Sequence, residues 1–251
     1  MSTPTLSMIV PYRDRREHLE TFVEWCADGR GGAAHAGREV LFLEVGARQT
    51  EARALASAAG FRYHFVECEG VFHKSRALNI GLAMARGELV TPYDIDLVPL
   101  GDTLERHTRA ALASPALLLT GYRLLSKQRR VAPSEVRREA ERAQVAAEDG
   151  ESALRKQLLT GEHFGHVPMF RSEILRSIGG WDEEYVGWGP EDQDMIERYL
   201  AATDGVFARV PEFVYLHLFH EPAPLWNERE LVEMNRRKYY AARDASGVND
   251  R

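Results

Sequence analysis

Short apolar runs alternate with amphipathic stretches along the first hundred residues of this 251-residue chain. Four of the runs have the length of buried strands: Leu6–Val10, Val40–Val45, Phe61–Val66 and Leu89–Tyr93. Helices are expected between and after them, at Leu19–Cys26, Gln49–Ala59 and Ser75–Ala85. Strands that alternate with helices predict an α/β fold, in which a mainly parallel sheet is flanked by helices on both faces.

Composition narrows the classes of function. A hydrophobic content of 44% fits a globular chain with a core, and a formal net charge of −6 argues against general nucleic-acid binding. The two cysteines, Cys26 and Cys68, match no metal or redox spacing. We interpret them as reduced structural cysteines, with a single disulfide as the alternative.

The sequence carries no visible secretory or membrane signal. Met1–Ser7 lacks the charged and apolar regions of a signal peptide, and no apolar run approaches the ~18 residues of a membrane span. We therefore expect a cytoplasmic protein that would reach a membrane acceptor only by peripheral contact. The many Arg and Ala residues are typical of a GC-rich bacterial genome.

The fourth expected strand ends in two alternate carboxylates, Asp94 and Asp96. Carboxylate oxygens suit Mn²⁺ or Mg²⁺, and such an ion suits a diphosphate; a solvated acidic turn is the alternative. Pro11–Arg16 follows the first strand, and its arginines could hold a diphosphate or form surface ion pairs. Because ligands of parallel sheets sit at the carboxyl ends of the strands, we expect the two segments to share one crevice.

Two further segments place charged groups at expected helix starts. In Gly187–Asp194, glycines around Trp188 indicate a mobile loop with a stacking surface, followed by Glu191 and Asp192. Aromatic faces and carboxylates bind sugars, and a carboxylate there could take a proton from a hydroxyl; an acidic helix start is the alternative. In Phe72–Gly81, Lys74 lies near a helix N-terminus, which favours anions, although an ordinary helix is the alternative.

Histidine pairs suggest a metal site. His217 and His220 follow the apolar run Phe213–Leu216, and their spacing allows both to meet one metal ion. The carboxylates at Asp94 and Asp96 favour this interpretation over a structural one. His163 and His166 form a second pair, so a zinc site is the competing hypothesis.

Three segments show no catalytic pattern. Gly29–Ala34 superficially fits a dinucleotide fingerprint, but it follows a helix rather than a strand and is interpreted as a loop. Ser134–Leu159 is rich in Arg, Glu and Ala, which predicts an exposed helix broken near Gly150; an acceptor-binding or homodimer arm is the alternative. Glu228–Arg243 predicts a charged C-terminal helix.

In this order, the motifs resemble those of the metal-dependent β-1,4-galactosyltransferase family and its bacterial relatives. The matching segments lie within residues 6–221: Pro11–Arg15, His18–Leu19, Phe72–Gly81, Asp94–Pro99, Phe164–Gly165, Gly179–Trp181, Gly187–Asp194 and His217–His220. The resemblance implies one GT-A (Rossmann-like) domain over 1–251. Its nucleotide-binding half would span about 1–100, its acceptor half about 101–225 with a helical insertion at 126–160, and a C-terminal helix 226–251.

The resemblance also implies an activity and residue roles. The enzyme would be an inverting, Mn²⁺-dependent glycosyltransferase (Mg²⁺ as the alternative) that moves Gal, GalNAc or Glc from a UDP-sugar to a hydroxyl of a glycan, lipid-linked or small-molecule acceptor. Asp96, His217 and His220 would bind the metal, Asp192 would be the general base, and Glu191 would bind sugar hydroxyls. Together with Lys74, the residues that would line the donor site are Pro11, Tyr12, Arg13, Arg15, Asp94 and Trp188.

The chain departs from the family pattern at three positions. Pro190 and His166 replace glycines, and His163 lies in the region that selects the donor sugar in the family. Pro190 stiffens its loop and removes a backbone N–H. Three alternatives remain: a retaining transferase of the same fold, a non-catalytic sugar- or nucleotide-binding module, and a zinc hydrolase that uses the four histidines.

Overall fold

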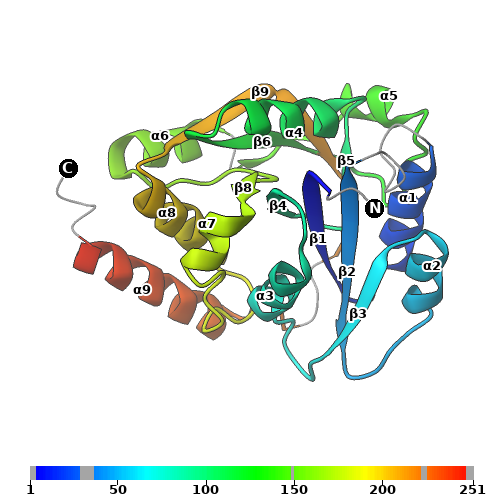
Figure 1. The fold of residues 1–251 in the computed structure, drawn as a ribbon, viewed down its shortest axis with the longest axis horizontal. Coiled ribbons are helices and arrows are strands. Elements are labelled where there is room, and N and C mark those ends of the chain that lie inside the picture. Colours follow the sequence, from blue (N-terminus) through cyan, green and yellow to red (C-terminus); the bar gives the residue numbers. More distant parts are fainter. Residues whose placement is uncertain (1–3, 29–36, 148–149, 222–224, 247–251) are drawn as a thin grey trace.

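The computed structural model describes residues 4–28, 37–147, 150–221 and 225–246 (Figure 1). The strands are β1 (Leu6–Tyr12), β2 (Arg38–Gly46), β3 (Arg62–Glu67), β4 (Leu89–Pro92), β5 (Leu97–Pro99), β6 (Leu117–Leu125), β7 (Gln144–Val145), β8 (Phe170–Arg171) and β9 (Val206–His217). The helices are α1 (Arg16–Ala27), α2 (Ala52–Ala58), α3 (Lys74–Met84), α4 (Thr103–Ala113), α5 (Val136–Ala140), α6 (Glu151–Thr160), α7 (Ser172–Ser177), α8 (Glu191–Thr203) and α9 (Arg229–Ser246). The segment Gly29–Ala34 lies outside the described residues.

The first sheet has the order β3-β2-β1-β4-β8, and its first four strands are parallel, as the sequence predicts. Successive side chains of a strand point to opposite faces. Met8 and Val10 of β1 therefore pack with α1 and α2, while Ile9 packs with α3. Helices α1 and α2 lie on one face of the sheet and α3 on the other (Figure 1). A Cβ at Gly81 would lie 2.3 Å from the Ile9 side chain, so glycine permits the close approach of α3 to β1.

A second sheet, which the sequence analysis did not predict, has the order β5-β9-β6-β7. Strands β6 and β9 are parallel, and β5 pairs antiparallel with β9. The apolar pattern indicated only the last third of β9. The earlier part of the strand contains Pro211, and the pairing of β9 with β6 shifts register between Thr120 and Tyr122. Only pairing with a partner strand extends β9 back to Val206.

The junction between the two sheets positions the acidic motif. Strand β4 belongs to the first sheet and β5 to the second, so Asp94–Asp96 forms the connection between them. Leu97 pairs with His217, and the N–H of Leu218 donates to the carbonyl of Asp96 at 2.9 Å. The antiparallel register therefore brings Asp96 to the end of β9.

The insertion differs from the single exposed helix predicted over Ser134–Leu159. Helices α5 and α6 are short, and β7 lies between them, where Val145 pairs with Leu124 at the edge of the second sheet. The open edge of β6 offers backbone partners that helix periodicity cannot reveal. Residues 126–160 are thus only partly helical.

Two further expectations concern the cysteines and the membrane. Cys26 and Cys68 are both free, which agrees with the reduced state expected from their spacing. Among the described helices, none combines the length and the apolar character that crossing a bilayer requires.

Candidate active site

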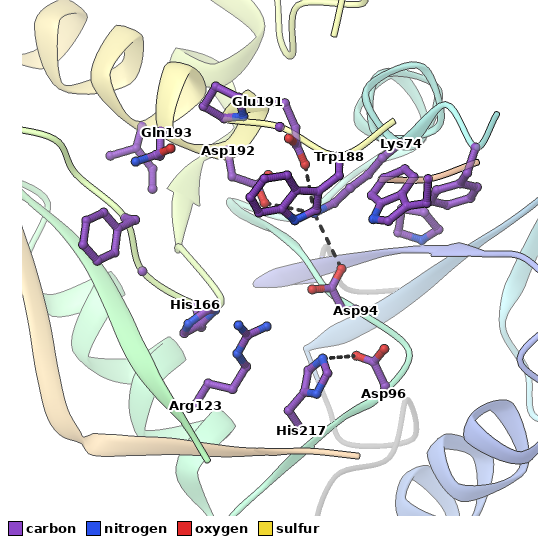
Figure 2. Close-up of a pocket in the computed structure, with 18 of the residues that line it drawn as sticks. Lys74, Asp94, Asp96, Arg123, His166, Trp188, Glu191, Asp192, Gln193 and His217 are labelled. Carbon is purple, nitrogen blue, oxygen red and sulfur yellow. Dashed lines mark hydrogen bonds and ion pairs between the residues drawn. The ribbon is translucent and has the colours of Figure 1, made fainter. Parts of the chain in front are cut away.

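A cleft of about 800 Å³ opens above the carboxyl ends of β1 and β4, beside the start of α8 and the end of β9 (Figure 2). It brings together nearly all of the residues that the sequence analysis singled out. The lining residues from that set are Pro11, Arg13, Arg15, Lys74, Asp94, Asp96, Trp188, Glu191, Asp192, His217 and His220. Segments more than 200 positions apart in sequence therefore face the same space.

Tyr12 is the exception among the expected donor-site residues. Its side chain is buried and packs against Phe42, with ring centroids 5.0 Å apart. Burial, followed by the charges of Asp14 and Glu44, raises the pKa of Tyr12 to about 12. Tyr12 belongs to the core because its neighbours Pro11 and Arg13 take the opposite side of the strand end and line the cleft.

Asp96 and two histidines form a compact group at one end of the cleft. Oδ1 of Asp96 lies 3.5 Å from Nε2 of His217 (Figure 2). Oδ2 of Asp96 lies 3.3 Å from Nε2 of His220. The three possible ligand atoms lie within 4.8 Å of one another, a spacing that could hold one metal ion. Asp96 is 1% exposed, and Arg15 also pairs with its Oδ2.

Lys74 occupies the centre of an acidic cluster on the other side of the cleft. Its Nζ donates to Oδ2 of Asp192 at 2.9 Å and lies 3.6 Å from Glu191 and 3.7 Å from Asp94. Burial opposes the charge of Lys74, but the three carboxylates outweigh burial and hold the pKa of Lys74 well above its usual value. The first turn of α3 thereby links β4 to the start of α8.

The carboxyl groups around Lys74 differ in protonation. Burial, followed by the neighbouring charge of Asp192, raises the pKa of Glu191 to about 8. Burial acts on Asp94 in the same direction, but Lys74 and then His217 outweigh it and lower the pKa of Asp94 to about 2. At neutral pH Glu191 is therefore a neutral group that can donate a hydrogen bond, and Asp94 is a carboxylate.

Two buried carboxyl oxygens of the cluster have no hydrogen-bond partner among the described residues. Among the described residues, Oε2 of Glu191 and Oδ1 of Asp192 are buried and accept no hydrogen bond. Buried polar atoms are normally paired, so such atoms at a cleft wall are suited to a ligand that donates hydrogen bonds. Sugar hydroxyls are donors of this kind.

The loop that carries Trp188 is fixed to the C-terminal part of the chain. The N–H of Trp188 donates to the carbonyl of Trp226 at 2.7 Å, and Nδ2 of Asn235 donates to the carbonyls of Val186 and Trp188 at 2.9 and 3.0 Å. A Cβ at Gly189 would lie 2.7 Å from Asn235. The loop predicted to be mobile is thus docked onto α9, and the Trp188 side chain remains 45% exposed in the cleft.

Arg13 holds the strand ends together. Its guanidinium donates to the carbonyls of Val45, Cys68 and Gly70 at 2.9, 3.0 and 2.6 Å and lies over the Phe72 ring. These bonds occupy much of the donor capacity that the sequence analysis assigned to a diphosphate. Arg13 therefore shapes the cleft by joining the loops after β2 and β3.

Several lining residues escaped the sequence analysis. They come mainly from β6, α6 and the C-terminal segment: Arg123, Lys156, Trp226, Arg236 and Tyr240. Tyr239, which lies on the expected C-terminal helix, also lines the cleft. Aromatic and basic residues on the C-terminal helix were a usable signal, but no local pattern shows which of its faces meets the cleft.

The two histidine pairs do not form one site. Among the described residues, the group that could hold a metal contains His217 and His220 with Asp96 but neither His163 nor His166. The His163 ring packs edge-on against Phe207, and the backbone of His166 pairs with Gly121. The geometry therefore gives no support to a zinc site built on all four histidines.

Two models of known protein families match this chain. Residues 7–178, more than half of the chain, match the model of glycosyl transferase family 2. The chain belongs to this family. Residues 150–221, which include the Trp188 loop and the end of β9, also match a model described as the N-terminal domain of galactosyltransferase. The expected galactosyltransferase-like family is confirmed.

Curated relatives of this family 2 chain include human chondroitin sulfate N-acetylgalactosaminyltransferases 1 and 2. Human transferase 1 is 23% identical over 100% of this chain, and human transferase 2 is 26% identical over 86% of this chain. The chain spans 46% and 40% of the lengths of these two relatives. Their remaining parts have no counterpart in the alignment.

Solved structures confirm the GT-A fold. S. aureus TarS superposes with a TM-score of 0.60 at 14% identity, and the match covers 86% of this chain and 37% of the TarS chain. A mycobacterial protein gives 0.61 at 18% identity, with 96% and 74% covered. The mannosyltransferase PcManGT from Pyrobaculum calidifontis, in complex with GDP-Man and Mn²⁺, gives 0.59 at 19% identity, with 98% and 65% covered.

Proposed function

We propose that this protein is an inverting glycosyltransferase that moves a hexose from a UDP-sugar to an acceptor hydroxyl. The observation that carries the proposal is the arrangement of the cleft. A carboxylate–histidine group stands at one end of it, and the Lys74-bound carboxyls of Glu191 and Asp192 stand at the other. The carboxylate–histidine group is suited to a diphosphate, and the carboxyls of Glu191 and Asp192 are suited to hydroxyls. The family and the names of the relatives favour Gal or GalNAc as the hexose, with Glc as the alternative.

The possible metal-ligand atoms in the cleft fit a divalent cation such as Mn²⁺. Oδ1 of Asp96 is buried and accepts no hydrogen bond from any described residue, and two imidazole nitrogens lie close to this carboxylate. One carboxylate and two imidazoles suit Mn²⁺, and Mg²⁺ is the alternative. Asp96, His217 and His220 would hold the ion, which when bound supplies positive charge to the leaving diphosphate.

Asp192 is the proposed general base. Lys74 holds its Oδ2, which leaves Oδ1 to receive the proton of the acceptor hydroxyl. The acceptor oxygen then forms a bond to the anomeric carbon while the bond to the UDP oxygen breaks, so configuration inverts. Neutral Glu191 would orient sugar hydroxyls, and the Trp188 indole would give the sugar a flat apolar face.

Calorimetry with UDP and two variants, followed by transfer assays, tests the proposal. Asp96→Ala should lose at least tenfold in Mn²⁺-dependent UDP affinity, because the metal group loses its only carboxylate. Asp192→Asn should bind UDP within about twofold of the wild type and lose at least 10²-fold in transfer rate, since general-base catalysis contributes typically 10²–10⁴-fold. Undiminished turnover in Asp192→Asn would refute the base, and the absence of UDP binding would refute the nucleotide site.

The cleft also favours treating residues 1–251 as one domain. Lys74 and Asp94 come from the half expected to bind nucleotide, whereas Asp192 and His217 come from the half expected to bind acceptor. Neither half alone contains the proposed site. We therefore propose that the halves act as one catalytic unit.

A further inference from the structure

We propose that Arg236 makes this enzyme selective for acceptor sugars that carry an anionic group. The proposal rests on the transferase function above and assigns a substrate class to its acceptor side. Arg236 lies on α9, beyond residue 221, where both family matches have ended. The selectivity would therefore be a property of this chain that the family does not itself supply.

Arg236 differs from the other basic residues of α9. Arg229 and Arg237 pair with Glu233, Lys238 pairs with Asp182 and Glu184, and Arg243 pairs with Glu197. Arg236 is exposed and lines the cleft, and no carboxylate of the described chain lies within ion-pair distance of it. Its charge is available to a ligand.

Arg236 lies beside the loop that precedes the proposed reaction centre. Its guanidinium carbon lies 5.8 Å from the centroid of the Trp188 ring. The neighbouring residue, Asn235, is buried and bonds the backbone of the Trp188 loop, so the same turn of α9 holds both the loop and the cation. Trp188 lies four residues before the proposed base, Asp192, and both line the cleft.

The location favours the acceptor over the donor as the anionic ligand. The proposed metal group and Arg15 lie at the Asp96 end of the cleft, where they would meet a diphosphate. Arg236 lies with Trp188 and Tyr240 at the wall formed by α9, where aromatic faces can stack on a sugar.

A second cation lines the same cleft. Lys156 of α6 is 61% exposed, and within the described part of the chain its ion-pair partner is Glu162, at 4.0 Å. An arginine fork forms paired hydrogen bonds with a carboxylate or a phosphate, and a nearby ammonium adds attraction to either. The chemistry that this wall would recognise is thus an anionic sugar, either a uronate or a sugar phosphate.

Ligand-observed NMR titration of the UDP- and Mn²⁺-loaded protein tests this selectivity. The probes are methyl β-D-glucuronide, glucose 6-phosphate and neutral methyl β-D-glucoside. We expect at least one anionic probe to bind fivefold or more tightly than the glucoside, and Arg236→Gln to abolish the difference. The matched control is Arg237→Gln, because Arg237 is the next residue on α9 and pairs with Glu233. The preferred anion distinguishes a uronate from a phosphate.

Calorimetric titration of both variants with UDP separates the remaining outcomes. Unchanged UDP affinity in Arg236→Gln supports an acceptor role, whereas a loss of UDP affinity confined to this variant would assign Arg236 to the diphosphate and overturn the proposal. Equal affinities of the wild type for all three probes, or no binding of any of them, would also overturn it. Failure of the wild type to bind UDP would instead refute the proposed function on which this inference rests.

Discussion

At the scale of single residues, Lys74 determines the electrostatics of the cleft. One ammonium faces three carboxyl groups, so the acidic residues at the start of α8 and the end of β4 can lie together. Two of these groups, Glu191 and Asp94, do not titrate alike, because burial raises the pKa of Glu191 whereas the charge of Lys74 outweighs burial and lowers the pKa of Asp94. Different environments for neighbouring carboxyls are how enzymes assign acid, base and binding roles.

Replacing Glu191 with glutamine should change how stability depends on pH. The folded protein keeps Glu191 protonated up to about pH 8, whereas the unfolded chain releases this proton near its ordinary pKa of 4.5. Between these values the unfolded state binds fewer protons, so this group makes the free energy of unfolding fall as pH rises, by up to about 1.4 kcal/mol per pH unit. Glu191→Gln removes the contribution.

Urea unfolding at intervals from pH 5 to pH 8 measures this effect. The stability of Glu191→Gln relative to the wild type should increase steadily across the range. Glu230→Gln is the matched control, because Glu230 is exposed in the first turn of α9. Parallel pH profiles for the wild type and Glu191→Gln would contradict the assigned protonation of Glu191.

At the scale of elements, α9 acts as a support for the catalytic loop. Tyr239 donates to Oε1 of Glu197 at 2.6 Å, and Arg243 bonds both Glu197 and the carbonyl of Thr160. These bonds fasten α9 to α8 and to the end of α6. Helix α9 thereby closes one wall of the cleft and holds the Trp188 loop through Asn235.

Asn235→Ala should release the Trp188 loop without unfolding the protein. Two loop carbonyls would lose their donor, which costs about 1–3 kcal/mol of stability. Hydrogen exchange at residues 186–189 should accelerate at least tenfold, and the transfer rate should fall while UDP affinity changes little. Met234→Ala is the control, because Met234 is 51% exposed on the same helix. Unchanged exchange in the loop would show that Asn235 does not hold it.

At the scale of the whole molecule, the proposed site joins two sheets. Asp96 directly precedes β5, and His217 ends β9, so the metal group depends on the pairing of these strands in the second sheet. The acidic cluster depends on α3, which packs on the first sheet. A ligand that spans the cleft would therefore contact residues positioned by both sheets.

Mn²⁺ should consequently stabilise the whole fold. A ligand that binds only the folded state adds about 2.7 kcal/mol at 100 times its dissociation constant. We expect thermal unfolding to shift upward with Mn²⁺ in the wild type and the shift to be lost in His220→Ala, which removes one proposed ligand. His64→Ala is the control, because His64 is exposed on β3. A shift that persists in His220→Ala would place the ion elsewhere.

The sequence by itself determined the parallel half of the fold and most of the site. Alternating apolar runs and helical faces are local properties, so they predicted β1 to β4 and α1 to α3. The residues that follow strands β1 and β4 in sequence necessarily meet at one sheet edge, which brought Arg13 and Asp94 to the cleft. Likewise, Lys74 and Asp192 could be assigned to helix starts from their neighbours alone.

Only the tertiary structure decided the second sheet, the partners of Lys74 and the part played by α9. Strand β9 and the short β7 exist through pairing with β6, and a partner strand is not a local property. From the sequence alone, Tyr12 and Arg13 were equivalent donor-site candidates. In the structure, Tyr12 packs in the core, whereas Arg13 donates hydrogen bonds to three backbone carbonyls. Asn235 lies in a charged helix, and its role follows solely from the packing of that helix against a loop almost fifty residues earlier.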